Sequence, residues 1–264
     1  AFGQGSLYSN VTGDGNSAFG VSALTANTGN YNSAFGWRAG YGNTSGTQNL
    51  FVGYATGYGN TTGGYNAAVG NTALYTNTTG SYNTALGVDA LRLNTTANNL
   101  TAVGYQALYS NTNANNSAAF GYKAAYAATN GAIDAFGYLA ATSTTTGIWN
   151  SAFGTVALQN NTTGSDNVAI GAYALNSNTV GAYNTALGYQ ALKINNGNFN
   201  VGLGIFAGNT ITTGSHNVAI GDNSMSSTNN ITGDYNVGVG GITFLNLSSG
   251  RSEEHTSELQ SLAY

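Results

Sequence analysis

The 264-residue sequence contains no cysteine and no proline, and only 5% of its residues are charged. Without cysteine, neither a disulfide framework nor thiol chemistry is available. A net charge of −4 and an isoelectric point near 4.7 give no basic surface for DNA or RNA. No apolar run reaches the length of a membrane-spanning helix. We therefore expect no nucleic-acid partner and no membrane insertion in this segment.

Low charge with abundant glycine, asparagine and threonine can also indicate disorder. Disorder does not fit this chain, because its apolar residues are phased. A glycine that follows a bulky apolar residue, the phase glycine, recurs every sixteen or seventeen residues until a last step of nineteen. The phase glycines are Gly3, Gly20, Gly36, Gly53, Gly70, Gly87, Gly104, Gly121, Gly137, Gly154, Gly171, Gly188, Gly204, Gly221 and Gly240. Such a short period predicts units that bury apolar side chains only by stacking on their neighbours.

Counting from the phase glycine divides the repeat into columns of like residues. The alanine column, two residues before the glycine, departs from alanine at Phe51, Gly202 and Gly238, and the first asparagine column lies four before it. The bulky column directly precedes the glycine: Phe2, Phe19, Phe35, Val52, Val69, Leu86, Val103, Phe120, Phe136, Phe153, Ile170, Leu187, Leu203, Ile220 and Val239. This alternation predicts a short β-strand with bulky residues on one face and small residues on the other.

A second apolar segment follows each phase glycine and ends in a turn such as Asn-Thr-Thr-Gly at 77–80. Its leucine column, four residues after the glycine, includes Leu24, Leu74, Leu91, Leu108, Leu158, Leu175, Leu192 and Met225. Glycine, asparagine and hydroxyl side chains suit such turns. We interpret this segment as a second short strand, so that each unit has two strands and no helix.

Identical columns favour an all-β fold, a parallel β-solenoid of about 15 coils with a 16–17-residue repeat. In-register stacking would align the asparagines into side-chain amide ladders. Residues 1–250 form this repeat shaft, and we expect both native ends to be missing. Residues 251–264 resemble a translated sequencing-library adapter, which predicts a non-native tail; the alternative is a short charged C-terminal helix.

Each coil is small, so its core is thin and much of its apolar surface remains exposed to water. The alanine and glycine face would be flat and suited to the close approach of another backbone. We therefore infer self-association, as a cyclic homo-oligomer of three chains. The period supports the association but not the number three.

An enzyme is the class we favour least, and no catalytic, cofactor-binding or metal-binding residue is predicted. His216 occupies a turn column that elsewhere holds aromatic residues such as Tyr65 and Tyr82, so we interpret it as a turn residue. Asp14 and Asp234 share another turn column, where aspartate usually accepts backbone hydrogen bonds. The aspartates do not follow the alternating pattern of calcium-binding repeats.

Two further columns carry candidate sites. The aromatic column, directly after the phase glycine, holds Trp37, Tyr54, Tyr105, Tyr122, Tyr138 and Tyr189. These rings could stack on the sugars of surface glycans, or on one another along the axis, and we favour the second interpretation. Asn43, Asn60, Asn77 and Asn94 begin Asn-x-Ser/Thr triplets seventeen residues apart. They predict either a row of glycans or only turn chemistry, which we prefer.

The motif at 66–80 and 83–96 resembles repeats in the shafts of phage tail fibres and related trimeric surface proteins. The segments Asn167-Val-Ala-Ile-Gly171 and Asn217-Val-Ala-Ile-Gly221 are similar to the head repeat of trimeric autotransporter adhesins. The resemblance covers nearly all of residues 1–250. It implies a left-handed parallel β-roll with three chains packed side by side.

The expected function is a non-enzymatic structural shaft of a phage tail fibre or cell-surface appendage that supports attachment. Its location would be extracellular or on a virion surface, and its partner would be itself. A glycan-binding trimeric adhesin that uses the aromatic column is the alternative. Ice binding by the recurring threonine pairs is a lower alternative, because those threonines lie beside turn glycines.

Overall fold

The computed structural model describes residues 1–227, 229–243 and 254–256, and these residues form strands and turns without a helix. The chain divides into two compact units, Ala1–Phe136 and Gly137–Tyr264. The first unit contains β1 (Ser17–Phe19), β2 (Ser33–Phe35), β3 (Leu50–Val52), β4 (Ala67–Val69), β5 (Thr84–Leu86), β6 (Thr101–Val103), β7 (Ala118–Phe120) and β8 (Ile133–Phe136). The second contains β9 (Asn150–Phe153), β10 (Val168–Ile170), β11 (Thr185–Leu187), β12 (Val201–Leu203), β13 (Val218–Ile220), β14 (Val237–Val239) and β15 (Glu254–Thr256).

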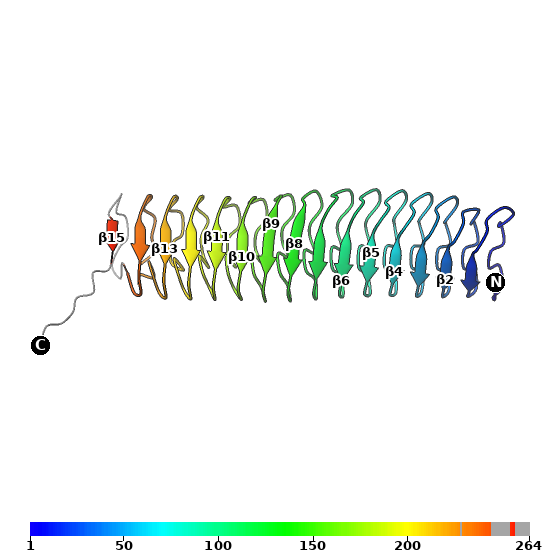
Figure 1. Cartoon of the computed structure of the whole chain (residues 1–264), viewed down its shortest axis with the longest axis horizontal. Helices are drawn as coiled ribbons and strands as arrows, with labels where there is room; N and C mark the ends of the chain where they lie inside the picture. Colours follow the sequence, from blue (N-terminus) through cyan, green and yellow to red (C-terminus); the bar gives the residue numbers. More distant parts are fainter. Residues whose placement is uncertain (228, 244–253, 257–264) are drawn as a thin grey trace, which may run out of the picture. The chain divides into compact units, whose positions relative to one another are not determined.

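Each unit is a parallel β-solenoid, with one strand per coil and turns at both ends of every strand (Figure 1). Consecutive strands pair in register, so that Ala68 lies opposite Ala85 and Val69 opposite Leu86. Every column of the sequence therefore forms a file of side chains inside its unit. This confirms the predicted parallel solenoid. Of the predicted non-native tail, only β15 is described, and it pairs with β14.

Hydrogen bonds between coils continue through the turns and are not confined to the strands. In the coil that starts at Gly70, the first amides donate to the preceding coil and later ones to the following coil. The bonds run from Gly70 N to Val52 O (2.8 Å), Thr72 N to Tyr54 O (3.0 Å), Leu74 N to Ala90 O (2.9 Å) and Thr78 N to Thr95 O (2.8 Å). The backbone of one coil is thus satisfied by its two neighbours.

The phase glycine is required at the point where the strand turns. Gly70 has a φ of +138°, and a Cβ atom there would overlap the carbonyl oxygen of Gly87 in the next coil. Only glycine reaches this backbone region without strain. The column that marks the repeat in the sequence is therefore also the column with the strictest backbone requirement.

The predicted second strand is wrong. The segment after each phase glycine is a turn, in which Thr72 and Leu74 have φ values of 51° and 52°. This left-handed conformation costs non-glycine residues about 1–2 kcal/mol each. The cost is offset because the turn points the leucine column inward, where Leu74 is fully buried, and keeps the hydrogen bonds between coils.

The predicted role of the two strand faces is also wrong. The alanine column points into the coil, where Ala18, Ala34 and Ala68 are fully buried. The bulky column points outward, and Phe19 and Leu86 are 48% and 47% exposed. The alanine face therefore cannot receive another chain, because it packs against the leucine column of its own coil.

Two asparagine files line the buried ends of most coils. In the first asparagine column, Asn49 Oδ1 accepts from Asn66 N (3.0 Å), and Asn66 Oδ1 accepts from Asn83 N (3.0 Å). The second asparagine column, seven residues after the phase glycine, forms a direct amide ladder. Asn77 Nδ2 donates to Asn60 Oδ1 at 2.6 Å. The predicted ladders are confirmed, and they satisfy polar groups that the small core would otherwise leave unpaired.

Phe51 is a large residue in the alanine column, and the leucine column beside it holds glycine. It replaces alanine in the alanine column and is fully buried. The leucine column carries glycine in its own coil and in the coil before, at Gly57 and Gly40. A Cβ atom at Gly40 would lie 2.8 Å from Phe51 Cδ2, and one at Gly57 would overlap the same ring. The phenylalanine ring therefore fills the space that two leucine side chains leave.

We expect Phe51→Ala to lower the free energy of unfolding by about 3–5 kcal/mol, because it leaves a cavity between Gly40 and Gly57. Gly57→Leu alone should also destabilise the chain, by overlap with the Phe51 ring. The double variant reproduces the pairing of Ala68 with Leu74, so its loss should be smaller than the two single losses combined. Urea denaturation followed by circular dichroism measures this coupling, and strictly additive losses would contradict the size exchange.

Candidate functional site

The aromatic column lies at the surface, next to the outward ends of the strands. Trp37 and Tyr54 are 38% and 52% exposed, and their rings stack with centroids 4.7 Å apart. Tyr105 and Tyr122 form a second stacked pair at 5.3 Å. The structure brings these four predicted residues together as two pairs.

In the second unit, the ring contacts of Tyr189 are edge to face and not parallel stacks. Tyr189 meets Tyr173 and Phe206 edge to face, with centroids 6.0 and 5.4 Å apart. Tyr138 is 52% exposed. In both units, ring surfaces already in contact with a neighbouring ring cannot receive a sugar. Mutual stacking, the interpretation we favoured, therefore describes the observed contacts.

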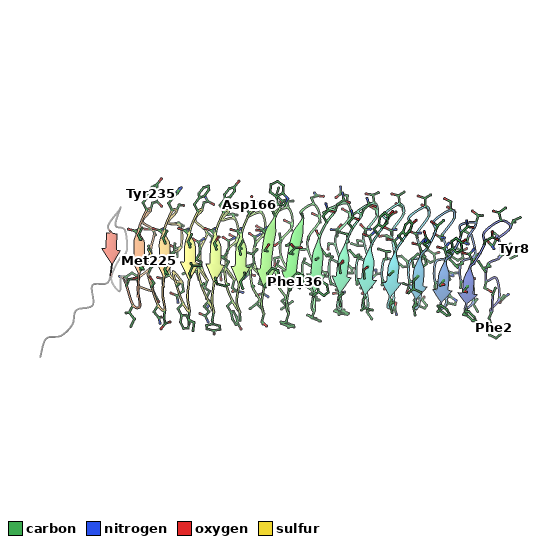
Figure 2. All side chains as sticks on the ribbon, viewed as in Figure 1. Phe2, Tyr8, Phe136, Asp166, Met225 and Tyr235 are labelled. Carbon is green, nitrogen blue, oxygen red and sulfur yellow. The ribbon has the colours of Figure 1, made fainter. Side chains whose placement is uncertain are left out.

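A separate file of rings lies on the turns before the strands, five residues before each phase glycine. Tyr65 stacks on Tyr82 at 4.9 Å in the first unit. In the second unit Tyr235 and Asp166 mark this line of turns, with their side chains pointing outward (Figure 2). His216 lies between Phe199 and Tyr235, with centroid distances of 4.9 and 4.6 Å. Its contacts are those of a stacked turn residue, as its column predicts.

A third aromatic file was not predicted from the sequence: the second tyrosine column, five residues after the phase glycine. Tyr58 stacks on Tyr41 and on Tyr75 at 5.2 and 5.1 Å. Further along, the Arg92 guanidinium takes a ring's place in the file and lies 5.8 Å from the Tyr75 ring. The seventeen-residue spacing of these tyrosines was the signal that could have revealed the file.

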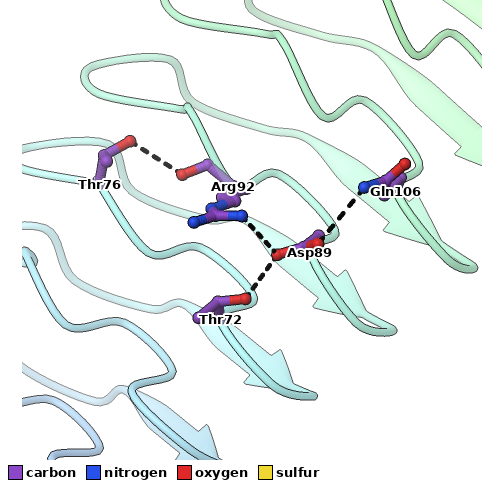
Figure 3. A network of polar contacts seen from close by, with 5 residues as sticks. All are labelled: Thr72, Thr76, Asp89, Arg92 and Gln106. Carbon is purple, nitrogen blue, oxygen red and sulfur yellow. Dashed lines mark hydrogen bonds and ion pairs between the residues drawn. The ribbon is translucent and has the colours of Figure 1, made fainter.

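Arg92 also forms an ion pair. Its guanidinium lies 3.3 Å from Asp89 Oδ1, which also accepts a hydrogen bond from the Thr72 hydroxyl (Figure 3). Asp89 Oδ2 accepts from Gln106 Nε2 at 3.4 Å. The carboxylate thus joins side chains from three successive coils. A half-exposed pair of this kind adds little stability, and its arrangement indicates a structural link between coils.

The four asparagines of the predicted glycan row belong to the second asparagine column: Asn43, Asn60, Asn77 and Asn94. All four are fully buried. The amide nitrogen of Asn60 donates to Asn43 Oδ1 at 2.6 Å and to Gly63 O at 2.9 Å. A glycan on this nitrogen would need the space and the hydrogens that the ladder uses. Their contacts in the folded chain are those of structural turn residues.

The most extensive surface feature is the outward side of the strands, made of the bulky column and of the residue two positions before it. We call this the outer strand face. In the second unit, Ile170 and Leu187 of this face are 40% and 48% exposed. Soluble monomers rarely expose extended apolar patches without a binding role. The sequence predicted a surface for self-association, but the structure locates the apolar surface on the opposite side of the strand.

Within the described ranges, no three histidine, cysteine, aspartate or glutamate side chains come together as a metal site would require. A search of the same residues finds no helix with the length and apolarity needed to cross a membrane. Comparison with protein-family models, curated proteins and solved structures gives no match. Inferences about function therefore depend on the surface and the packing of this chain alone.

We expect Asn60→Leu to destabilise the chain by several kcal/mol. The leucine would leave Asn43 Oδ1 without its donor and would remove one of the two hydrogen bonds made by Gly63 O and by the Asn77 amide, and an unsatisfied buried group costs about 1–3 kcal/mol. Asn71→Leu, at an exposed position of the aromatic column, is the control and should change stability little. Thermal denaturation of the two variants checks this, and equal melting temperatures would refute the role of the ladder.

Proposed function

We propose that the chain is a segment of a non-enzymatic structural fibre, the shaft of a phage tail fibre or of a cell-surface appendage. Its chains associate side by side, in threes as the resemblance implies, and support attachment at a distance from the particle or cell. The observation that carries the proposal is the uninterrupted hydrogen bonding between coils within each unit, together with an exposed apolar strand face.

The use of the polar side chains supports a load-bearing role. The hydroxyls of Thr61 and Thr78 each donate to the backbone of the next coil at 2.9 Å. Buried asparagines donate along the ladders, and tyrosines stack along their columns. Groups that could bind or transform a substrate are therefore engaged in joining one coil to the next. Ice binding has less support for the same reason, because the first hydroxyl of each threonine pair, such as that of Thr61 or Thr78, already donates to the next coil.

The fibre proposal predicts self-association of the full chain. At micromolar concentration, we expect light scattering and sedimentation equilibrium to give a mass of three times 26.8 kDa, because the outer strand face is too apolar to remain wet. A different multiple would preserve the fibre and correct the number of chains. A single-chain mass at all concentrations would refute the fibre.

A glycan-binding adhesin is the second candidate, and the exposure of the aromatic column favours it. Trp37 and Tyr54 expose ring edges at the surface, and the Arg38 guanidinium covers the Trp37 ring at 4.3 Å. The edges of the Trp37 and Tyr54 rings and the Arg38 guanidinium could contact an anionic sugar, whereas the stacked ring faces could not.

If the chain binds glycans, a glycan array should give signals that disappear in the Trp37→Ala, Tyr54→Ala and Tyr105→Ala variants. Tyr58→Ala is a matched control, because it removes an equally stacked ring from the second tyrosine column. Circular dichroism verifies that each variant keeps its fold. Binding that is absent in the parent, or equal in all variants, would refute this candidate.

A further inference from the structure

The two residues that each strand contributes to the outer strand face vary in size together. Where the bulky column holds phenylalanine, the residue two positions earlier is small or short: Ser17 with Phe19, Ser33 with Phe35, Ala118 with Phe120, Asp134 with Phe136, and Ser151 with Phe153. Where it holds an aliphatic residue, the partner is larger or β-branched in all but one coil: Leu50 with Val52, Thr84 with Leu86, Thr101 with Val103, Val168 with Ile170, Thr185 with Leu187, Val201 with Leu203, Val218 with Ile220, and Val237 with Val239. Ala67 with Val69 is the exception.

Size exchange of this kind has a clear meaning inside the coil. There, Phe51 replaces alanine where Gly40 and Gly57 replace leucine, and its ring occupies the space that leucine side chains would fill. A surface in contact with water alone does not limit the combined size of two neighbouring side chains, since water fills any shape. The exchange on the outer strand face therefore indicates that this face is also packed, against a layer that requires constant thickness.

Charge on this face is equally restricted. Among the outward-pointing residues of β1–β14, Asp134 alone is charged. The basic residues lie in other columns, with Arg38 and Lys123 two residues after a phase glycine and Arg92 and Lys193 five residues after one. A partner for this face must itself be apolar and nearly uncharged, because a buried unpaired charge is costly.

A second copy of this chain meets these requirements. It presents the same strand spacing of about 4.8 Å and the same apolar files, so that the faces of neighbouring copies can pack together. A face three residues wide over the eight strands β1–β8 covers roughly 400 Å². The six strands β9–β14 of the second unit carry a separate patch of roughly 300 Å².

We infer that the outer strand face is the surface through which copies of this chain pack, sheet against sheet, and that paired residue sizes keep the contact flat. This inference rests on the proposed fibre function and names the partner and the surface. The turn tyrosines, including Tyr82 and Tyr183, then remain exposed in the assembly.

The first experiment places charge on the face of the full chain. Leu86→Glu combined with Leu187→Glu should give the mass of a single chain in sedimentation velocity, with the parental circular dichroism spectrum. The matched control is Tyr82→Glu combined with Tyr183→Glu, at positions of similar exposure on the turns. The control should keep the parental mass.

The second experiment tests thickness without adding charge. Ser33→Leu beside Phe35 makes one coil too thick, and we expect the dissociation constant of the assembly to rise roughly tenfold. Ser33→Leu combined with Phe35→Val reproduces the pair Leu50 and Val52 and should restore the parental constant. This series decides the question if the glutamate variant loses its β-structure.

The outcomes separate this inference from the fibre itself. If the strand variants keep the parental mass and constant, or if only the tyrosine variants dissociate, the inference is overturned and the fibre stands. An equal constant for the parent, Ser33→Leu and the double variant would mean that the size exchange acts within one chain, which also overturns the inference. A parent that is a single chain overturns both.

Discussion

Hydrogen bonding between successive coils is the interaction on which the rest of each unit depends. A strand of three residues has no stability alone, and a turn with left-handed leucines is strained. Both persist because the amides and carbonyls of every coil form hydrogen bonds with the facing positions in the neighbouring coils. The asparagine ladders extend this bonding to side chains, and the phase glycines allow neighbouring backbones to approach. The repeat is therefore maintained by axial bonding, with a thin apolar core that fixes the orientation of each column.

The sequence was sufficient to predict the parallel solenoid, the files and the asparagine ladders, because each follows from the period alone. It could not reveal which strand face is buried. Alternation shows that Ala68 and Val69 point to opposite sides, but the side is decided by volume. Leu74 reaches across the coil from the turn and leaves space only for alanine opposite it. The left-handed conformation of Leu74 was equally hidden, because bonding between coils overrides its local preference.

For the candidate site, the columns identified which rings share a surface but not how they contact one another. Trp37 and Tyr54 were predicted together and do stack, whereas Tyr189 meets its neighbours edge to face. These differences depend on which side chains flank a ring in adjacent coils. In each unit the pattern is the same: polar and aromatic groups form contacts along the axis, and one apolar strand face is exposed.

The exchange between Phe51 and its two glycines has a consequence for how the gene can change. Nearly identical repeats invite unequal recombination, which adds or removes whole coils and so alters length in discrete steps. Most such crossovers would bring together two coils whose core side chains fit each other. One that separated Phe51 from Gly57 would force its ring against a leucine, and one that removed Phe51 alone would leave a void. The stretch from Gly40 to Gly57 should therefore be inherited as an indivisible block inside an otherwise extensible array.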